Sequence, residues 1–164
     1  MPESACQGCG VELPVHEGPV HRYMASSPAC WVKYGQLLTR EYSDPTYFRA
    51  HRLTVDSYAV QHPGPPSPQS IQSVAVHLMA LHVILEHGFD DDRARTLLRT
   101  AADHGRFVWL EPPTVRPVAT VLHPLAADSA EAHAVAVREW ALAAWATWHD
   151  HHERIRAWTR AFAT

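Results

Sequence analysis

Three cysteines are the residues of this chain whose types and spacing point most directly to chemistry. Cys6 and Cys9 enclose Gln-Gly, and Gly10 follows them. Two residues between the thiolates let both sulfurs turn toward one point, and the glycines allow the tight backbone that this requires. Cys30 falls near the start of a predicted helix, where unpaired backbone N–H groups and the helix dipole favour a thiolate. The pattern predicts a zinc site with these three cysteines as ligands.

A fourth ligand is needed to complete a tetrahedral zinc site of the ordinary structural class. His21 lies between the two cysteine elements and is the predicted fourth ligand, with His16 as the next choice. Two alternatives stay open, namely a catalytic zinc with an open position and free or redox-active cysteines. One observation speaks against the redox alternative: a thioredoxin-type Cys-x-x-Cys belongs at a strand-to-helix junction of a βαβ unit, which this sequence does not show.

The chain also carries 13 histidines, so ligands and proton carriers are plentiful at neutral pH. Asp56 and His62 lie on one predicted helix, and His77 lies on the next, which should return antiparallel after a short proline turn. That geometry would let the three side chains approach one another. Together they form a candidate acid–base site, and a further ligand from the last helix, His152, would make it a second metal site. Alternatively, each of these four residues has only a structural role, as part of a hydrogen-bond network that fixes the helix packing.

The elements that must position these residues are predicted to be helices. Ser27-Pro28, Asp44-Pro45 and Ser67-Pro68 each pair an N-cap residue with a proline at the first helical position, and Gly88 is a typical helix end. Residues 106–124 contain four prolines, which predicts a surface loop with room for a short edge strand. Apolar residues recur at helical spacing over 28–42, 45–62, 68–87, 91–104 and 129–162.

The predicted fold is therefore mainly α, a bundle of about five helices with a short N-terminal zinc-knuckle annex. We expect one domain over 1–164, with the annex at 1–27 and the bundle at 28–164. The third helix is apolar nearly all round, which predicts that it is the buried centre of the bundle.

Composition and charge exclude several classes of function. Hydrophobic residues make up 46% of the chain and charged residues 19%, as in globular proteins. A formal net charge of -3 gives no general attraction to phosphate backbones, so nucleic acid is not an expected partner. No apolar run reaches the roughly 20 residues that span a bilayer, and the N-terminus lacks a secretion signal. We expect a cytoplasmic protein with no membrane partner.

Several long motifs carry a resemblance to a known family. They are Cys6 to Gly10, Ser27 to Trp31, His51 to Gly64 and Ser67 to Leu78. In these segments the chain resembles an uncharacterised bacterial family, domain of unknown function 5946. The cysteines, Asp56, His62 and His77 match that family's pattern, but the family implies no activity.

Two functions remain as hypotheses from the sequence. The first is a zinc-stabilised module that binds an unidentified protein or small-molecule partner. The second is a small metal-dependent or acid–base enzyme that uses Asp56, His62 and His77, with His152 as an additional ligand.

Overall fold

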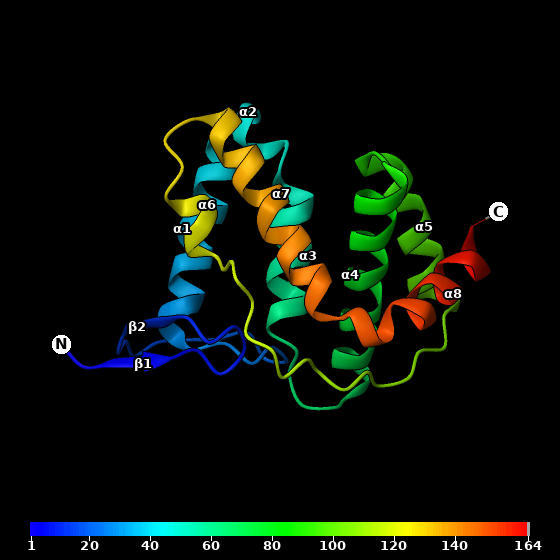
Figure 1. Ribbon diagram of the computed structural model, residues 1–164, viewed down its shortest axis with the longest axis horizontal. Helices are drawn as coiled ribbons and strands as arrows, with labels where there is room; N and C mark the ends of the chain where they lie inside the picture. Colours follow the sequence, from blue (N-terminus) through cyan, green and yellow to red (C-terminus); the bar gives the residue numbers. More distant parts are fainter. Residues whose placement is uncertain (164) are drawn as a thin grey trace.

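The computed structural model describes residues 1–163 as a helical bundle with a small hairpin at its N-terminal end (Figure 1). Most helices follow the predicted segments, whereas the two strands of the hairpin were not predicted. In chain order the elements are β1 (Glu3–Ala5), β2 (Glu12–Pro14), α1 (Pro28–Ser43), α2 (Pro45–Phe48), α3 (His51–Gln61), α4 (Pro68–His87), α5 (Asp91–His104), α6 (Leu122–Leu125), α7 (Ala130–Thr147), the 3-10 helix η1 (His149–His151) and α8 (His152–Phe162).

The predicted helix starts are confirmed by their capping contacts. The Ser27 side chain accepts a hydrogen bond from the backbone N–H of Cys30, which satisfies one of the free donors at the start of α1. Asp44 and Ser67 cap α2 and α4 in the same way, each directly before a proline. At the other end of α4, Gly88 takes the left-handed conformation, with φ of 66°, that glycine adopts most readily.

Helix α4 is the centre of one of the two hydrophobic clusters, as its apolar sequence predicted. It packs against α3, α5, α7 and α8. Leu78, Met79 and Leu81 on this helix are fully buried, and Trp148 and Ile155 close the cluster from the C-terminal part of the chain. Among residues 1–163, α4 is also the one helix long and apolar enough to cross a membrane. Half of its most apolar stretch is buried, as in the core helix of a soluble protein.

Two predicted helices are divided in the structure. The segment predicted at 45–62 forms α2 and α3, separated by a turn at residues 49–50. The segment predicted at 129–162 forms α7, η1 and α8, and the division falls at Trp148. This side chain is buried, and its indole N–H donates to the Val60 carbonyl at 3.2 Å. Trp148 thus fixes the point from which α8 turns to lie across α4 and α5 (Figure 1).

The proline-rich segment 106–124 is a loop, as predicted, but the short edge strand for which the prediction left room is not formed among the described residues. The end of the segment begins the short helix α6. The loop runs from α5 back past the N-terminal hairpin (Figure 1). The Gln61 side chain holds it by donating to the Ala119 carbonyl at 2.9 Å.

The N-terminal segment has its own hydrophobic contacts with the bundle. Strands β1 and β2 pair antiparallel, with Ser4 opposite Leu13. The second hydrophobic cluster joins this hairpin to α1, α3 and α7, and includes the three cysteines, Leu13, Tyr34, Leu37, Tyr58 and Trp140. The division into an annex at 1–27 and a bundle at 28–164 stays a prediction.

Candidate metal centre

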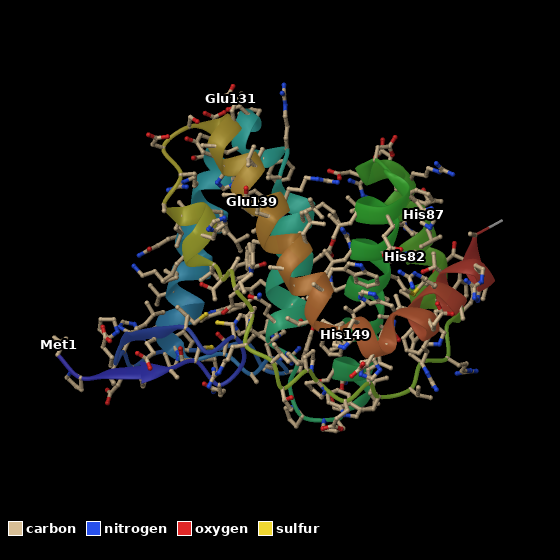
Figure 2. All side chains as sticks on the ribbon, viewed as in Figure 1. Met1, His82, His87, Glu131, Glu139 and His149 are labelled. Atoms are coloured by element: carbon tan, nitrogen blue, oxygen red, sulfur yellow. The ribbon has the colours of Figure 1, made fainter. Side chains whose placement is uncertain are left out.

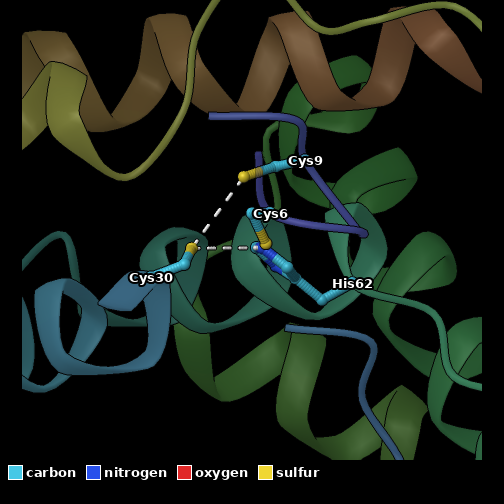
Figure 3. A group of neighbouring side chains, drawn as sticks. All are labelled: Cys6, Cys9, Cys30 and His62. Carbon is cyan, nitrogen blue, oxygen red and sulfur yellow. Dashed lines mark hydrogen bonds between the residues drawn. The ribbon is translucent and has the colours of Figure 1, made fainter. Parts of the chain in front are cut away.

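Three cysteines and one histidine meet at the junction of the hairpin with the bundle (Figure 3). Cys6 and Cys9 lie in the loop between β1 and β2, and Cys30 is the third residue of α1. His62 follows the last residue of α3 as its C-cap. All four residues are buried, and their ligand atoms lie within 4.8 Å of one another. The group could hold a metal ion.

Two separations within this group are close to those expected around a tetrahedral ion such as Zn²⁺. The Sγ atoms of Cys9 and Cys30 are 3.9 Å apart, and Nε2 of His62 is 3.4 Å from Sγ of Cys30. A tetrahedral ion with Zn–S bonds of about 2.3 Å and Zn–N bonds of about 2.0 Å would place two sulfurs about 3.8 Å apart and a sulfur and a nitrogen about 3.5 Å apart. Small movements of the side chains would therefore complete the coordination.

The glycines beside the cysteines are required by this arrangement. A Cβ atom on Gly8 would lie 2.5 Å from Cδ2 of His62, closer than real Cβ atoms approach other heavy atoms. Gly10 has a φ of 77°, in the left-handed region, and its N–H donates to the Cys6 carbonyl at 2.8 Å. The two glycines let the loop fold tightly and let His62 approach its backbone.

The bundle fixes which nitrogen of His62 faces the sulfurs. Nδ1 lies 2.7 Å from the backbone carbonyl oxygen of Tyr58. A carbonyl only accepts hydrogen bonds, so Nδ1 carries the proton and Nε2 keeps a free lone pair for a metal. Ligating histidines ordinarily have such a partner for their second nitrogen. The ring also stacks on that of Tyr58, with centroids 3.9 Å apart.

The sulfurs are hydrogen-bonded as well. The backbone N–H of Ser27 donates to Sγ of Cys6 at 3.3 Å, and the Tyr58 hydroxyl donates to Sγ of Cys30 at 3.5 Å. The Tyr58 hydroxyl is in turn held by Ser26, whose Oγ is 2.5 Å from it. Such donors stabilise thiolates, the form of cysteine that binds metals.

Without a metal, the close packing of these groups shifts the pKa values of Cys6, Cys9 and His62. Hydrogen bonding to Cys30 and Cys9 holds the pKa of Cys6 well below its usual range, whereas hydrogen bonding to Cys30 and burial raise that of Cys9. Burial lowers the pKa of His62, but hydrogen bonds and charges from Cys30 and Cys6 outweigh it and raise the value to about 9. A divalent cation would remove this conflict, because it allows all three thiolates to be charged and His62 to be neutral.

His62, and not His21, is the histidine that the structure places beside the cysteines. His21 accepts a hydrogen bond from the backbone N–H of Tyr23 at 3.4 Å, and its ring packs edge-on against Tyr23 and Trp31. His16 is exposed. Neither residue belongs to the group that could hold a metal.

Asp56 and His77 do come together, but without His62. Nδ1 of His77 lies 2.7 Å from Oδ1 of Asp56. The same carboxylate receives two hydrogen bonds of 2.9 Å from Arg52, one turn earlier on α3. Both nitrogens of His62 face other partners, the Tyr58 carbonyl and the cysteines. Asp56 and His77 therefore form a pair with Arg52, and His62 belongs to the candidate metal centre.

His152 lies apart from both groups. Its Nε2 donates to the Trp145 carbonyl at 2.9 Å, and its ring stacks on that of Trp145, with centroids 3.7 Å apart. No group of residues in the described part of the chain that could hold a metal includes His152.

The sequence does contain a signal for the role of His62, in the Pro63-Gly64 turn that follows it. A Cβ on Gly64 would collide with the Tyr23 carbonyl, so the chain before Cys30 runs directly against this turn. The backbone N–H of Ala25 donates to the His62 carbonyl at 3.1 Å, which confirms that the two segments are adjacent. A glycine at such a crossing indicates close approach of two backbones.

Comparison with known proteins gives one finding. The model of a family of unknown function, DUF5946, matches residues 4–149. No curated protein and no solved structure matches the chain.

Proposed function

The chain belongs to the family of unknown function DUF5946, so we propose a role from the site itself: a zinc-stabilised helical module that binds a partner. The observation that carries the zinc assignment is the buried group of Cys6, Cys9, Cys30 and His62, whose donor types and separations suit Zn²⁺. Three thiolates and an imidazole favour zinc over magnesium or calcium, which prefer oxygen ligands.

The zinc would be structural. Four protein ligands complete a tetrahedron, so no position is left for water or substrate, unlike the three-ligand sets of catalytic zinc sites. The ligands come from three segments: the hairpin loop, the start of α1 and the end of α3. One ion would therefore fix the first 27 residues, whose buried hydrophobic residues are Cys6, Cys9 and Leu13, onto the bundle.

A hollow beside the metal centre supports a binding role. It has a volume of about 240 Å³, and Gly8 and Cys9 form one wall. Gln61 and Trp148 from the bundle and prolines of the 106–124 loop form the rest. Its walls combine apolar side chains with the polar side chains of Gln7, Gln61 and Thr147, and polar groups of this kind orient ligands in small-molecule sites. Zinc would shape this hollow by holding the loop that carries Cys9, so we propose a small molecule as the partner.

The zinc assignment is tested by metal analysis of the purified full-length protein. We expect one tightly bound zinc per chain after gel filtration in the presence of a weak chelator. Replacement by Co²⁺ should produce the visible d–d bands of a tetrahedral ion together with near-ultraviolet thiolate-to-cobalt charge transfer. Protein that is folded and reduced, yet takes up neither metal, would show that the cysteines do not form a zinc site.

The Asp56–His77 pair favours a second candidate function, acid–base catalysis. The buried carboxylate orients the ring of His77, as a triad aspartate orients its histidine. His77 lines an open hollow of about 450 Å³, together with Ser73 one turn earlier on α4 and Gln72. Nε2 of His77 makes no hydrogen bond within residues 1–163, so it could exchange a proton with a bound molecule.

This second candidate is tested with p-nitrophenyl acetate, an ester that positioned imidazoles hydrolyse. If His77 acts as a base, His77→Gln should lower the rate by about 10²-fold, the smaller end of what general acid–base catalysis contributes. Asp56→Asn should also lower it, while His104→Gln, a change at the exposed end of α5, serves as the control. Equal rates in the His77→Gln and His104→Gln variants would exclude acid–base catalysis of this ester by the pair.

A further inference from the structure

A second group of potential metal ligands lies at the other end of the molecule, on the last turns of α4. It consists of His82, Glu86 and His87, whose ligand atoms lie within 4.8 Å of one another. His82 and His87 lie on the part of α4 that faces α8 (Figure 2). Glu86 lies four positions after His82 and projects from a neighbouring part of the helix surface. The ring of His87 packs edge-on against that of His82, with centroids 4.8 Å apart.

His82 has a ring nitrogen that its surroundings do not satisfy. The residue is 3% exposed, and Nδ1 has no hydrogen-bond partner within the described residues. Oε2 of Glu86 lies 2.8 Å from this nitrogen, so the two form an ion pair when His82 is protonated, but they form no hydrogen bond. A buried ring nitrogen without a hydrogen bond is costly, so this feature requires an explanation. A cation that both atoms bind would provide one.

The carboxylate of Glu86 is held in place by α7 and α8. Its Oε1 accepts from the indole N–H of Trp145 at 3.0 Å and from Nη2 of Arg156 at 2.9 Å. Nε of Arg156 reaches Oε2 at 3.2 Å. Such partners orient a ligating carboxylate. The guanidinium charge also opposes a cation at this carboxylate, so the site should bind more weakly than the cysteine site.

The group borders open space. A hollow of about 410 Å³ is lined by His82, Glu86 and His87 on one side and by Phe89, Arg156 and Thr159 on the other. Three protein ligands beside such a hollow leave at least one coordination position for water or another small ligand, as in zinc sites of the two-histidine, one-glutamate type.

We propose that His82, Glu86 and His87 bind a second divalent transition-metal ion, of the class of Zn²⁺ or Co²⁺, with an open coordination position facing the hollow. Imidazole nitrogens with one carboxylate suit these ions better than Mg²⁺ or Ca²⁺. The site differs from the second metal site expected from the sequence, because His152 is bound to the Trp145 carbonyl and takes no part. It shares no ligand with the cysteine site, so either can exist without the other.

Titration of the full-length protein with Co²⁺, after one equivalent of Zn²⁺ has filled the cysteine site, tests this proposal. We expect one further equivalent of Co²⁺ to bind, with visible d–d bands but without thiolate charge transfer. Cobalt bound by the cysteines would show thiolate-to-cobalt charge transfer. Cobalt bound without this absorption must therefore lie at another site. A titration in which the zinc-loaded protein binds no cobalt would overturn the proposal.

Ligand variants then assign the residues. His87 is exposed, so His87→Ala should fold normally and weaken cobalt binding by more than the roughly 10- to 100-fold that loss of a partner behind a ligand costs. Glu86→Gln should do the same. His104→Ala, at the exposed end of α5, is the matched control and should bind cobalt as the parent protein does. Binding that is unchanged in His87→Ala, or equally weakened in His104→Ala, would contradict the assignment. If the cysteine site itself fails to take up zinc, the thiolate-free cobalt spectrum still reports on this group.

Discussion

His62→Gln is expected to abolish tight zinc binding, whereas His21→Ala should leave one zinc per chain. Nε2 of His62 lies 3.4 Å from Sγ of Cys30, and Nδ1 is fixed by the Tyr58 carbonyl, so the ring is already oriented for coordination. Loss of a hydrogen-bonding partner behind a metal ligand ordinarily costs about 10- to 100-fold in affinity, and loss of the ligand should cost more. The measurement is zinc content after competition with a chelator, for both variants side by side.

Cys30→Ser supplies a nearly isosteric control for the same experiment. It should lose zinc as His62→Gln does, while far-ultraviolet circular dichroism shows that the helices remain. Helices α4, α5 and α8 pack on one another away from the metal centre, so their signal should persist in both variants. Retention of zinc by His62→Gln together with its loss from His21→Ala would show that the sequence-based choice of His21 describes the site better than the structure does.

The contrast between His62 and His21 shows which ligands of the candidate site can be predicted from sequence patterns. Cys6, Cys9 and Cys30 could be grouped from the sequence because thiolates separated by two residues, and a cysteine at a helix start, have few other uses. The fourth ligand could not, because spacing favours candidates close in the chain and His21 lies between the cysteines. His62 reaches the sulfurs only because α3 ends beside the hairpin loop, a fact of tertiary packing.

The helices show the same difference between features set by local sequence and features set by tertiary packing. Their starts were predictable because Ser27, Asp44 and Ser67 satisfy free N–H groups locally, before any tertiary contact forms. The division at Trp148 was not, since alanine-rich sequence on both sides favours one continuous helix. What determines it is the burial of the Trp148 indole against the Val60 carbonyl, 88 residues away.

A buried carboxylate, Glu41, is a further feature that no sequence pattern predicted. On helical spacing alone it is one charged residue near the end of α1. In the structure it is fully buried, and Oε1 accepts hydrogen bonds from Thr54 and from Nε2 of His133, at 2.5 and 2.9 Å. Oε2 lies 2.8 Å from Nδ1 of His51. One side chain thus joins α1 to α3 and α7.

Glu41→Ala is therefore expected to destabilise the protein by about 3–5 kcal/mol, the range found when one partner of a buried charged network is removed. The change leaves Thr54 and His133 buried without their acceptor, and it opens a cavity among three helices. The matched control is Glu139→Ala, whose carboxylate pairs with His123 on the surface, where both side chains are largely exposed. Such pairs contribute about 1 kcal/mol or less.

Denaturant unfolding, followed by circular dichroism on zinc-loaded protein, compares the two variants at pH 7. The Glu41→Ala midpoint should fall well below that of Glu139→Ala, and zinc content should stay at one per chain, because no metal ligand contacts Glu41. Glu41→Gln separates charge from shape: the amide keeps the volume and can still accept from Thr54, so its loss of stability should be smaller than that of the alanine variant. Equal midpoints for Glu41→Ala and Glu139→Ala would mean that the three-helix junction is held by apolar packing alone, and that the buried carboxylate contributes nothing to it.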